Sequence, residues 1–355
     1  MPYTVGKIKL YMGPQTVGGP DNLAEAITGF IGKAKKSLDI AVQELDSEEI
    51  AKAIINTRPE VRVRIVTEAD YLKAPKFKDN PWSKGGKHEP NREIQNALLR
   101  SAAWVRSDYN PSIFHQKFII RDNGGLLTGS TNYTDTGTTN NLNHVIIIED
   151  EAVAKIYSKE YREIRHGHFG KLDEGHDPKP PQVTVSQIPI RILFAPDHSP
   201  EMDIMKQMLK AERRVDFAIF TFAESSGIDD TMQVIARNGI KIKGVLERKV
   251  ANQKWAANHH LVGKPNIKLY RTKRKGKLGK LHHKLMVIDE RVVVVGSFNY
   301  TGPANRLNDE NVIMIGDLDP DSPSAAAQKG LARYAITEIE RIIRDYGVEL
   351  QPVSP

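Results

Sequence analysis

The 355-residue sequence contains no cysteine, which excludes disulfide bonds, thiol nucleophiles and thiolate metal sites together. It also has no stretch that approaches the ~18 uninterrupted apolar residues of a membrane-spanning helix. The N-terminus, MPYTVGKIKLYMGP, lacks the basic start and apolar stretch of a secretory signal. We therefore expect a cytoplasmic protein without an integral membrane segment, although a chain whose signal has been removed would look the same.

The composition indicates folded domains without indicating a function. A hydrophobic fraction of 39% is enough to fill compact cores, and the length suggests about two domains. The 51 Lys and Arg residues exceed the 44 Asp and Glu residues, which leaves a net charge of +7. This small excess favours anionic partners, but many proteins that bind no nucleic acid carry as much.

The chain repeats itself. A strand pattern that ends in Pro and precedes a helical pattern occurs at Ile8 to Pro14 and again at Ile190 to Pro196. Buried-strand runs follow from Ser37 and from Arg214, and each leads into another helix and another strand. This alternation predicts an α/β fold of two similar lobes, each a mixed, mostly parallel sheet flanked by helices.

A segment rich in Pro, Gly and charged residues separates the two copies. We take this segment, 169–187, as the linker between an N-terminal lobe (1–168) and a C-terminal lobe (188–355).

One pattern of residue types occurs once in each half. The segments FHQKFIIRDNGGLLTGSTNYT and LHHKLMVIDERVVVVGSFNYT share the spacing HxKxxxxDxxxxxxGSxN. Six identities at these offsets arise by chance in a chain of this length only about 10⁻⁵ of the time. Apart from the glycine, the shared residues are His115, Lys117, Asp122, Ser130 and Asn132, and then His282, Lys284, Asp289, Ser297 and Asn299.

The pattern has a direct chemical sense. Alternate residues of a strand share a face, so His115 and Lys117 project together, and a returning strand brings Ser130 and Asn132 near them. Lysine, hydroxyl and amide donors suit the oxygens of a phosphate, and an imidazole attacks phosphorus or transfers protons near neutral pH. Two such sets across a pseudo-twofold interface would place imidazoles on opposite sides of one phosphate, as a two-step displacement requires.

The duplicated motif resembles the hallmark of the phospholipase D superfamily, and the resemblance covers nearly the whole chain. It implies two phospholipase D-like lobes related by a pseudo-twofold axis, with one active site between them that uses neither a metal nor a cofactor. It also implies phosphodiester hydrolysis or transfer through a covalent phosphohistidine. Because both half-sites lie in one chain, a monomer would suffice for activity, and a higher assembly stays open.

The two halves differ at the position 13 residues after the motif serine, where the family usually has a carboxylate that orients the motif histidine. This position is Glu310 in the second half but Asn143 in the first. A carboxylate raises the pKa of its imidazole, which suits a general acid, whereas an amide fixes the tautomer of a neutral ring. With each partner serving its own half, we predict His115 as the nucleophile and His282 as the general acid. The reverse holds if Glu310 stabilises a cationic phosphohistidine instead.

Asp122 and Asp289 complete the set of candidate site residues, but an Asp at a strand-to-strand turn commonly binds backbone amides, and we expect that structural role. Just before His282, a basic run is predicted to guide a polyanion to the site. It comprises Arg271, Lys273, Arg274, Lys275, Lys277 and Lys280. A long basic loop in the first half could line the same cleft with Lys73, Lys76, Lys78, Lys84 and Lys87.

Three functions are compatible with these features. The segments GSTNYT and GSFNYT resemble the bacterial nuclease branch, so our first hypothesis is a metal-independent nuclease acting on DNA or RNA. The second is a phospholipase D-type hydrolase or phosphatidyl transferase acting on phospholipids. The third is a non-catalytic module that binds nucleic acid. This alternative stays open because Asn143 stands where the family usually has a carboxylate.

Overall fold

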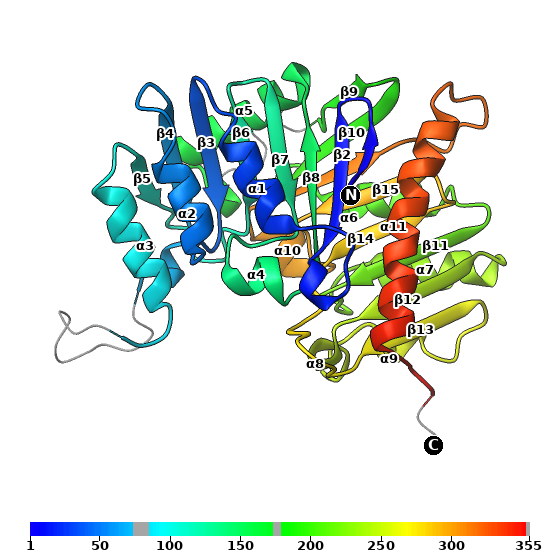
Figure 1. The fold of residues 1–355 in the computed structure, drawn as a ribbon. Coiled ribbons are helices and arrows are strands. Elements are labelled where there is room, and N and C mark those ends of the chain that lie inside the picture. Colours follow the sequence, from blue (N-terminus) through cyan, green and yellow to red (C-terminus); the bar gives the residue numbers. More distant parts are fainter. Residues whose placement is uncertain (74–84, 173–178, 353–355) are drawn as a thin grey trace.

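The structure, a computed structural model, describes residues 1–73, 85–172 and 179–352, so the predicted linker over 169–187 lies partly outside the described residues. The chain forms two mixed sheets, and helices cover both (Figure 1). The predicted α/β class with two similar lobes is confirmed.

The first sheet has eight strands in the order β1-β2-β8-β7-β6-β3-β4-β5. These strands are β1 (Tyr3–Val5), β2 (Ile8–Gly13), β3 (Ser37–Val42), β4 (Arg62–Thr67), β5 (Trp104–Ser107), β6 (Lys117–Arg121), β7 (Gly125–Gly129) and β8 (Asn143–Ile148). Its helices are α1 (Leu23–Ile31), α2 (Glu48–Ile55), α3 (Glu89–Leu99), α4 (Asp135–Thr139) and α5 (Glu151–His166), with short 3-10 turns at Gln15–Val17, Ala69–Tyr71 and Gly170–Leu172.

The second sheet has nine strands in the order β17-β13-β12-β11-β14-β15-β16-β10-β9. They are β9 (Gln182–Val185), β10 (Ile188–Ala195), β11 (Arg214–Ile219), β12 (Lys241–Leu246), β13 (Ile267–Thr272), β14 (Lys284–Ile288), β15 (Val292–Gly296), β16 (Glu310–Ile315) and β17 (Gly347–Glu349). The helices are α6 (Pro200–Met208), α7 (Ile228–Arg237), α8 (Arg248–Ala251), α9 (Asn258–Leu261), α10 (Gly302–Arg306) and α11 (Ala325–Tyr346). The central strand order repeats that of the first sheet, which is the structural form of the sequence duplication.

Among the strands of the described residues, β3, β4 and β5 pair in parallel in one sheet, and β11, β12 and β13 do so in the other. The other pairs are antiparallel, so the sheets are mixed as predicted, but the prediction that they are mostly parallel is wrong, because antiparallel pairs outnumber parallel ones. The physical reason is the motif itself, because its two strands are joined by a tight turn and such a turn can only connect antiparallel neighbours.

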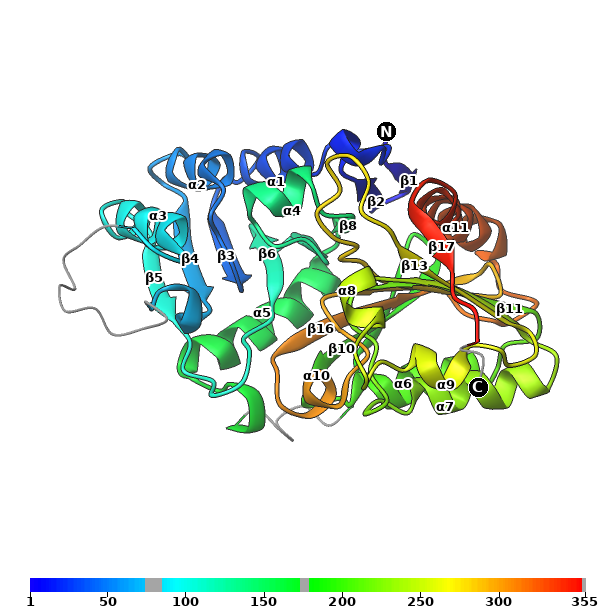
Figure 2. The same ribbon diagram turned by 90° about the horizontal axis from the view of Figure 1, so that it is seen from below.

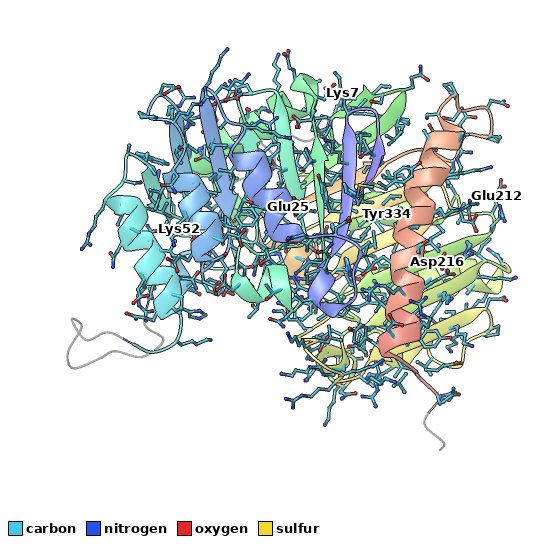
Figure 3. All side chains as sticks on the ribbon, viewed as in Figure 1. Lys7, Glu25, Lys52, Glu212, Asp216 and Tyr334 are labelled. Atoms are coloured by element: carbon cyan, nitrogen blue, oxygen red, sulfur yellow. The ribbon has the colours of Figure 1, made fainter. Side chains whose placement is uncertain are left out.

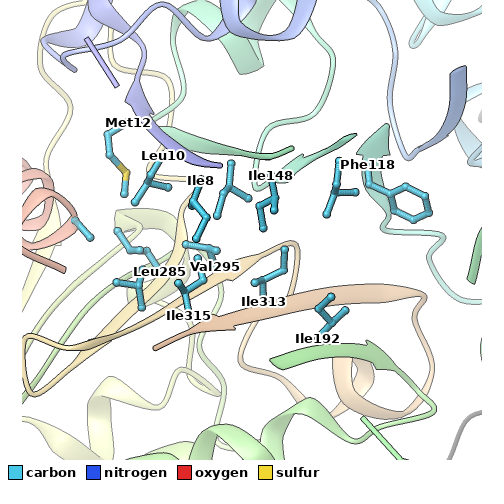
Figure 4. Close-up of a cluster of buried hydrophobic side chains, with 14 of the residues drawn as sticks. Ile8, Leu10, Met12, Phe118, Ile148, Ile192, Leu285, Val295, Ile313 and Ile315 are labelled. Carbon is cyan, nitrogen blue, oxygen red and sulfur yellow. The ribbon is translucent and has the colours of Figure 1, made fainter. Parts of the chain in front are cut away.

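The largest hydrophobic cluster lies between the two sheets. Strand β2 alternates buried and partly exposed residues, so its apolar side chains share the face that looks toward the second sheet. Figure 4 shows the two sets of side chains that meet there, from one sheet Ile8, Leu10, Met12, Phe118 and Ile148, and from the other Ile192, Leu285, Val295, Ile313 and Ile315. Burial of these side chains stabilises the lobes against each other, and this fixes the relative position of the two motifs.

Helices complete the arrangement on the outer faces. Helices α1 and α2 lie over the first sheet, and α6 and α7 lie over the second on the opposite side of the molecule (Figure 2). The long helix α11 also contacts the first lobe, since the hydroxyl of Tyr334 donates a hydrogen bond to Asp21. Figure 3 labels Tyr334 on this helix. Within the described residues, every helix is too short or too polar to pass through a bilayer.

Candidate active site

The two motifs meet at a cleft of about 330 Å³ between the lobes. Each motif histidine lies just before a central strand, and each motif asparagine follows the neighbouring strand of the hairpin. The lining residues are Gln43, Glu44, Tyr71, Ile113, His115, Asn132, Phe220, Thr221, Lys280, His282, Asn299, Thr301, Pro303 and Asn308. The structure therefore brings both predicted histidines and both predicted asparagines into one site.

Each motif histidine contacts a partner residue from the other lobe. Nδ1 of His115 lies 2.7 Å from Oε2 of Glu310, and Nδ1 of His282 lies 3.0 Å from Oδ1 of Asn143. The expectation that each partner serves the histidine of its own half is therefore wrong. Glu310 serves the first motif and Asn143 serves the second.

Backbone pairing between the lobes produces this exchange. The segment before His115 bridges to the segment before Glu310, where the amide of His115 donates to the carbonyl of Asp309 at 3.0 Å. In the related place, the amide of His282 donates to the carbonyl of Leu142 at 2.8 Å. Each histidine is thus held beside the strand that begins with the other half's partner residue.

The tautomer of both rings follows from their acceptors. Oε2 of Glu310 accepts from Ser297 Oγ at 2.6 Å, and Oδ1 of Asn143 accepts from Ser130 Oγ at 2.8 Å. An ionised carboxylate or an amide oxygen can only accept, so Nδ1 of His282 carries the hydrogen, and Nδ1 of His115 carries it when Glu310 is ionised. Nε2 is then the reactive nitrogen of both histidines.

The motif serines do not line the cleft. Ser130 and Ser297 are fully buried and accept hydrogen bonds at 3.0 Å from the amides of His144 and Asn311, besides donating to Asn143 and Glu310. The prediction that their hydroxyls bind phosphate oxygens is wrong. They orient the two partner residues, because a hydroxyl that both donates and accepts within the protein is already occupied.

The motif lysines lie beneath the cleft. Lys117 Nζ donates to the carbonyl of His115 at 2.8 Å and to Gln43 Oε1 at 3.1 Å, and Lys284 Nζ donates to the carbonyl of His282 at 2.9 Å. Burial lowers the pKa of Lys117 to about 7 and that of Lys284 well below its usual range. An anionic phosphate in the cleft would oppose this effect and favour both cations.

Burial is also the largest cause of the pKa shifts of the two motif histidines and of Glu310. It lowers the pKa of His115 and of His282 well below the usual value, and the nearby lysines act in the same direction. It raises the pKa of Glu310 to about 8, against the charges of Lys117 and Lys284, which favour the carboxylate. The site is therefore arranged to receive negative charge from a ligand.

The motif aspartates lie in turns, outside the residues that line the cleft. Asp122 accepts hydrogen bonds from the amides of residues 35–37, and Asp289 accepts from the amides of residues 212–214, at distances of 2.6 to 3.2 Å. They tie the motif hairpin to the start of β3 and of β11. This is the structural role that we expect for them.

Most residues of the basic run do not line the cleft. Lys280 lines it, but Arg271, Lys273, Arg274, Lys275 and Lys277 do not. Lys275 donates instead to the carbonyl of Asp345 at 3.2 Å. Of the six residues predicted to guide a polyanion, Lys280 alone lines the cleft, and the guiding role itself stays a prediction. Of the loop lysines, Lys73 and Lys87 do not line the cleft, and Lys76, Lys78 and Lys84 lie outside the described residues.

Several lining residues escape the sequence patterns, chiefly Gln43, Glu44, Tyr71 and Phe220. Gln43 and Phe220 hold equivalent positions directly after β3 and β11, so the repeat was the signal that could have identified them. The ring of Phe220 lies 4.9 Å from Lys284 Nζ and 4.8 Å from the ring of His282. Glu44 accepts a hydrogen bond from Asn132 at 3.0 Å.

The glycine of each motif ends a strand where no side chain fits. Gly129 and Gly296 have φ of 153° and 143°, and a Cβ on Gly296 would lie 2.2 Å from the carbonyl oxygen of Asn311. We expect Gly296→Ala to lower the free energy of unfolding by about 2–3 kcal/mol, because β15 must move away from β16. Urea unfolding measures this change. Gly29→Ala, at an exposed helical position with open space around it, is the matched control and should not destabilise; equal effects would contradict the prediction.

Comparison with known proteins places this site in context. A family model described as "Cardiolipin synthase, PLD-like domain" matches residues 27–165 and 204–328. The chain is 33% identical over 147 residues to a Xenopus laevis protein named mitochondrial cardiolipin hydrolase, a match that covers 41% of this chain and 58% of that protein. It is 28% identical over 136 residues to a Rickettsia conorii protein named phospholipase D, covering 38% of this chain and 65% of that protein. The chain thus matches less than two thirds of the length of these relatives.

Solved structures show the same fold over nearly the whole chain. The phosphatidylserine synthase of Haemophilus influenzae matches 99% of this chain and 89% of its own, with a TM-score of 0.65 at 15% identity. The polyphosphate kinase of Porphyromonas gingivalis matches 97% of this chain and 48% of its own, with a TM-score of 0.64 at 12% identity. Identities this low indicate a shared fold and leave the activity to be argued from the site.

Proposed function

The chain belongs to the phospholipase D-like family, a branch of a superfamily of phosphodiesterases, and from this premise we propose that it cleaves or transfers the phosphodiester bond of phospholipids. The observation that carries the proposal is the pair of imidazoles that line one cleft, each with Nδ1 held by a partner from the other lobe. The arrangement supports a displacement in two steps at a single phosphorus atom.

Bond making and breaking balance in this scheme. Nε2 of one histidine attacks phosphorus, and the bond between phosphorus and the leaving alcohol oxygen breaks as the second histidine donates a proton to that oxygen. The second histidine then removes a proton from water, whose oxygen attacks phosphorus and displaces the first histidine. An alcohol in place of water would give transfer instead of hydrolysis.

For the roles, we retain His115 as the nucleophile and His282 as the general acid, on a different reason from the one that the sequence suggested. From the sequence, we expect the general acid to be the histidine that has a carboxylate partner. Because Glu310 contacts His115, this criterion would make His115 the general acid and His282 the nucleophile. Instead, the carboxylate of Glu310 stabilises the positive ring that forms when His115 bonds to phosphorus. His282 has an amide partner and nearby lysines, so its protonated ring releases the proton readily.

Two observations favour phospholipids over nucleic acid. Both relatives described above carry names that refer to phospholipids or cardiolipin, and neither name refers to nucleic acid. In addition, five of the six residues proposed to guide a polyanion do not line the cleft. For the nuclease, the first hypothesis from the sequence, the basic run therefore supplies only Lys280 to the lining of the cleft.

The test is one assay in EDTA with vesicles of phosphatidylcholine or cardiolipin and with labelled DNA and RNA. We expect the protein to release the head-group alcohol and to leave the nucleic acids intact, and His282→Asn to abolish the release. Cleavage of DNA or RNA with intact lipid would replace the proposal with the nuclease. Tight DNA binding without any turnover would support the non-catalytic module.

A further inference from the structure

Immediately behind the catalytic pairs, a second layer of buried polar side chains joins the lobes. His144 follows Asn143 in the chain, and His283 follows His282. Their Nδ1 atoms lie 3.1 Å apart, their rings are nearly parallel at 8°, and both side chains are fully buried. This pair links β8 of the first lobe to the segment that enters β14 of the second.

The pseudo-twofold axis relates this pair to a different one. Asn311 follows Glu310, and Gln116 follows His115. Asn311 Nδ2 donates to Gln116 Oε1 at 2.8 Å, and both side chains are fully buried. The lobes are thus joined by an amide pair behind Glu310 and His115, and by an imidazole pair behind Asn143 and His282. Only the imidazole pair can titrate between pH 5 and 8.

Hydrogen bonding fixes the protons of the imidazole pair. The amide of Gly296 donates to Nε2 of His144 at 3.2 Å, so Nδ1 of neutral His144 carries the hydrogen and donates to Nδ1 of His283. Nε2 of His283 then carries its hydrogen toward Oε1 of Glu338, 3.7 Å away. A second proton on His144 would sit on Nε2 and face the amide hydrogen of Gly296. A second proton on His283 would sit on Nδ1 and face the hydrogen on Nδ1 of His144.

We propose that His144 and His283 are a positioning pair that keeps Asn143 and His282 in register across the lobe interface, and that they do so only while both rings are neutral. The inference rests on the proposed function in that it concerns the same site. Neither residue lines the cleft, so both act on the reaction through their chain neighbours.

The charged groups around the pair act in opposite directions. Lys284 disfavours a proton on either ring, and Arg341 on α11 disfavours one on His283. Glu338, which is itself paired with Arg341 at 2.7 Å, favours the cation of His283. Burial is the largest effect for both rings and lowers the pKa of each.

The sign of the pH dependence follows from this direction. Both rings have a lower pKa in the folded protein than in the unfolded chain, where histidine titrates near 6.5. Above about pH 6.5 neither state binds the extra protons, and the pair contributes its full stability. As the pH falls through 6.5, the unfolded chain takes up protons first, and stability is lost.

The test uses the double variant His144→Asn/His283→Gln, which replaces the imidazole pair with the two residue types of the amide pair. We expect its melting temperature to fall less than that of the parent between pH 7.5 and 5. We also expect its kcat at pH 5.5 to exceed that of the parent by about tenfold, with KM unchanged. His144→Ala should lower kcat at pH 7.5, since nothing then holds the register. Identical melting profiles for the parent and the double variant would overturn the proposal.

The reverse exchange, Gln116→His/Asn311→His, provides a second variant that does not depend on the first one folding. It installs a second imidazole pair, so its melting temperature should fall more steeply below pH 6.5 than that of the parent. An unchanged slope would count against the proposal. The melting arm needs no substrate, so it tests the requirement for neutral rings even if phospholipids prove not to be cleaved, whereas the kcat arm tests the positioning role.

Discussion

His115→Asn is expected to lower kcat by about 10⁴-fold or more, because it removes the nitrogen that bonds to phosphorus. His282→Asn should cost a similar factor with natural lipids, whose alkoxide leaving group needs a proton, but it leaves the nucleophile in place. The two variants therefore separate the roles only with a substrate whose leaving group needs no proton.

A p-nitrophenyl phosphodiester supplies such a substrate. We expect His282→Asn to release a burst of about one equivalent of p-nitrophenol and then stall, because the covalent intermediate forms but no base activates water. His115→Asn should give no burst. The control is His166→Asn, an exposed histidine outside the cleft, which should match the parent. A burst from His115→Asn with none from His282→Asn would exchange the two roles.

Glu310→Gln has the next largest expected effect, a loss of about 10²–10³-fold in kcat, because the fixed charge opposite the phosphohistidine disappears. The carboxylate is the active form, and burial raises the pKa of Glu310 to about 8. With the p-nitrophenyl substrate, whose departure needs no proton from His282, the rate of the parent should therefore rise with pH up to about 8, since Glu310 loses its proton over that range.

The pH profile of kcat/KM measures this dependence, and Glu310→Gln should lack the rise because an amide does not titrate in this range. The matched control is Glu25→Gln, an exposed glutamate on α1 outside the cleft, for which the profile should stay that of the parent. A retained rise in Glu310→Gln would assign the titration to another group, with Lys117 as the first to examine.

The sequence by itself determined a large part of this protein. The repeated strand patterns and the identical spacing around His115 and His282 were enough to predict two similar α/β lobes and the family. They also identified the histidines and asparagines of the cleft and the structural role of Asp122 and Asp289. These features are local, because strand periodicity and turn chemistry act over a few residues.

Only the tertiary structure decided which partner each histidine receives. Spacing relates Glu310 to Ser297 and Asn143 to Ser130 within each half, and those contacts form as expected for neighbours on adjacent strands. The contacts to His115 and His282 cross the pseudo-twofold axis, so they depend on how the two sheets pack. The hydrophobic periodicity of a strand shows that one of its faces is buried, but not which other strand packs against that face. For this reason the sequence does not reveal that each histidine takes its partner from the other half.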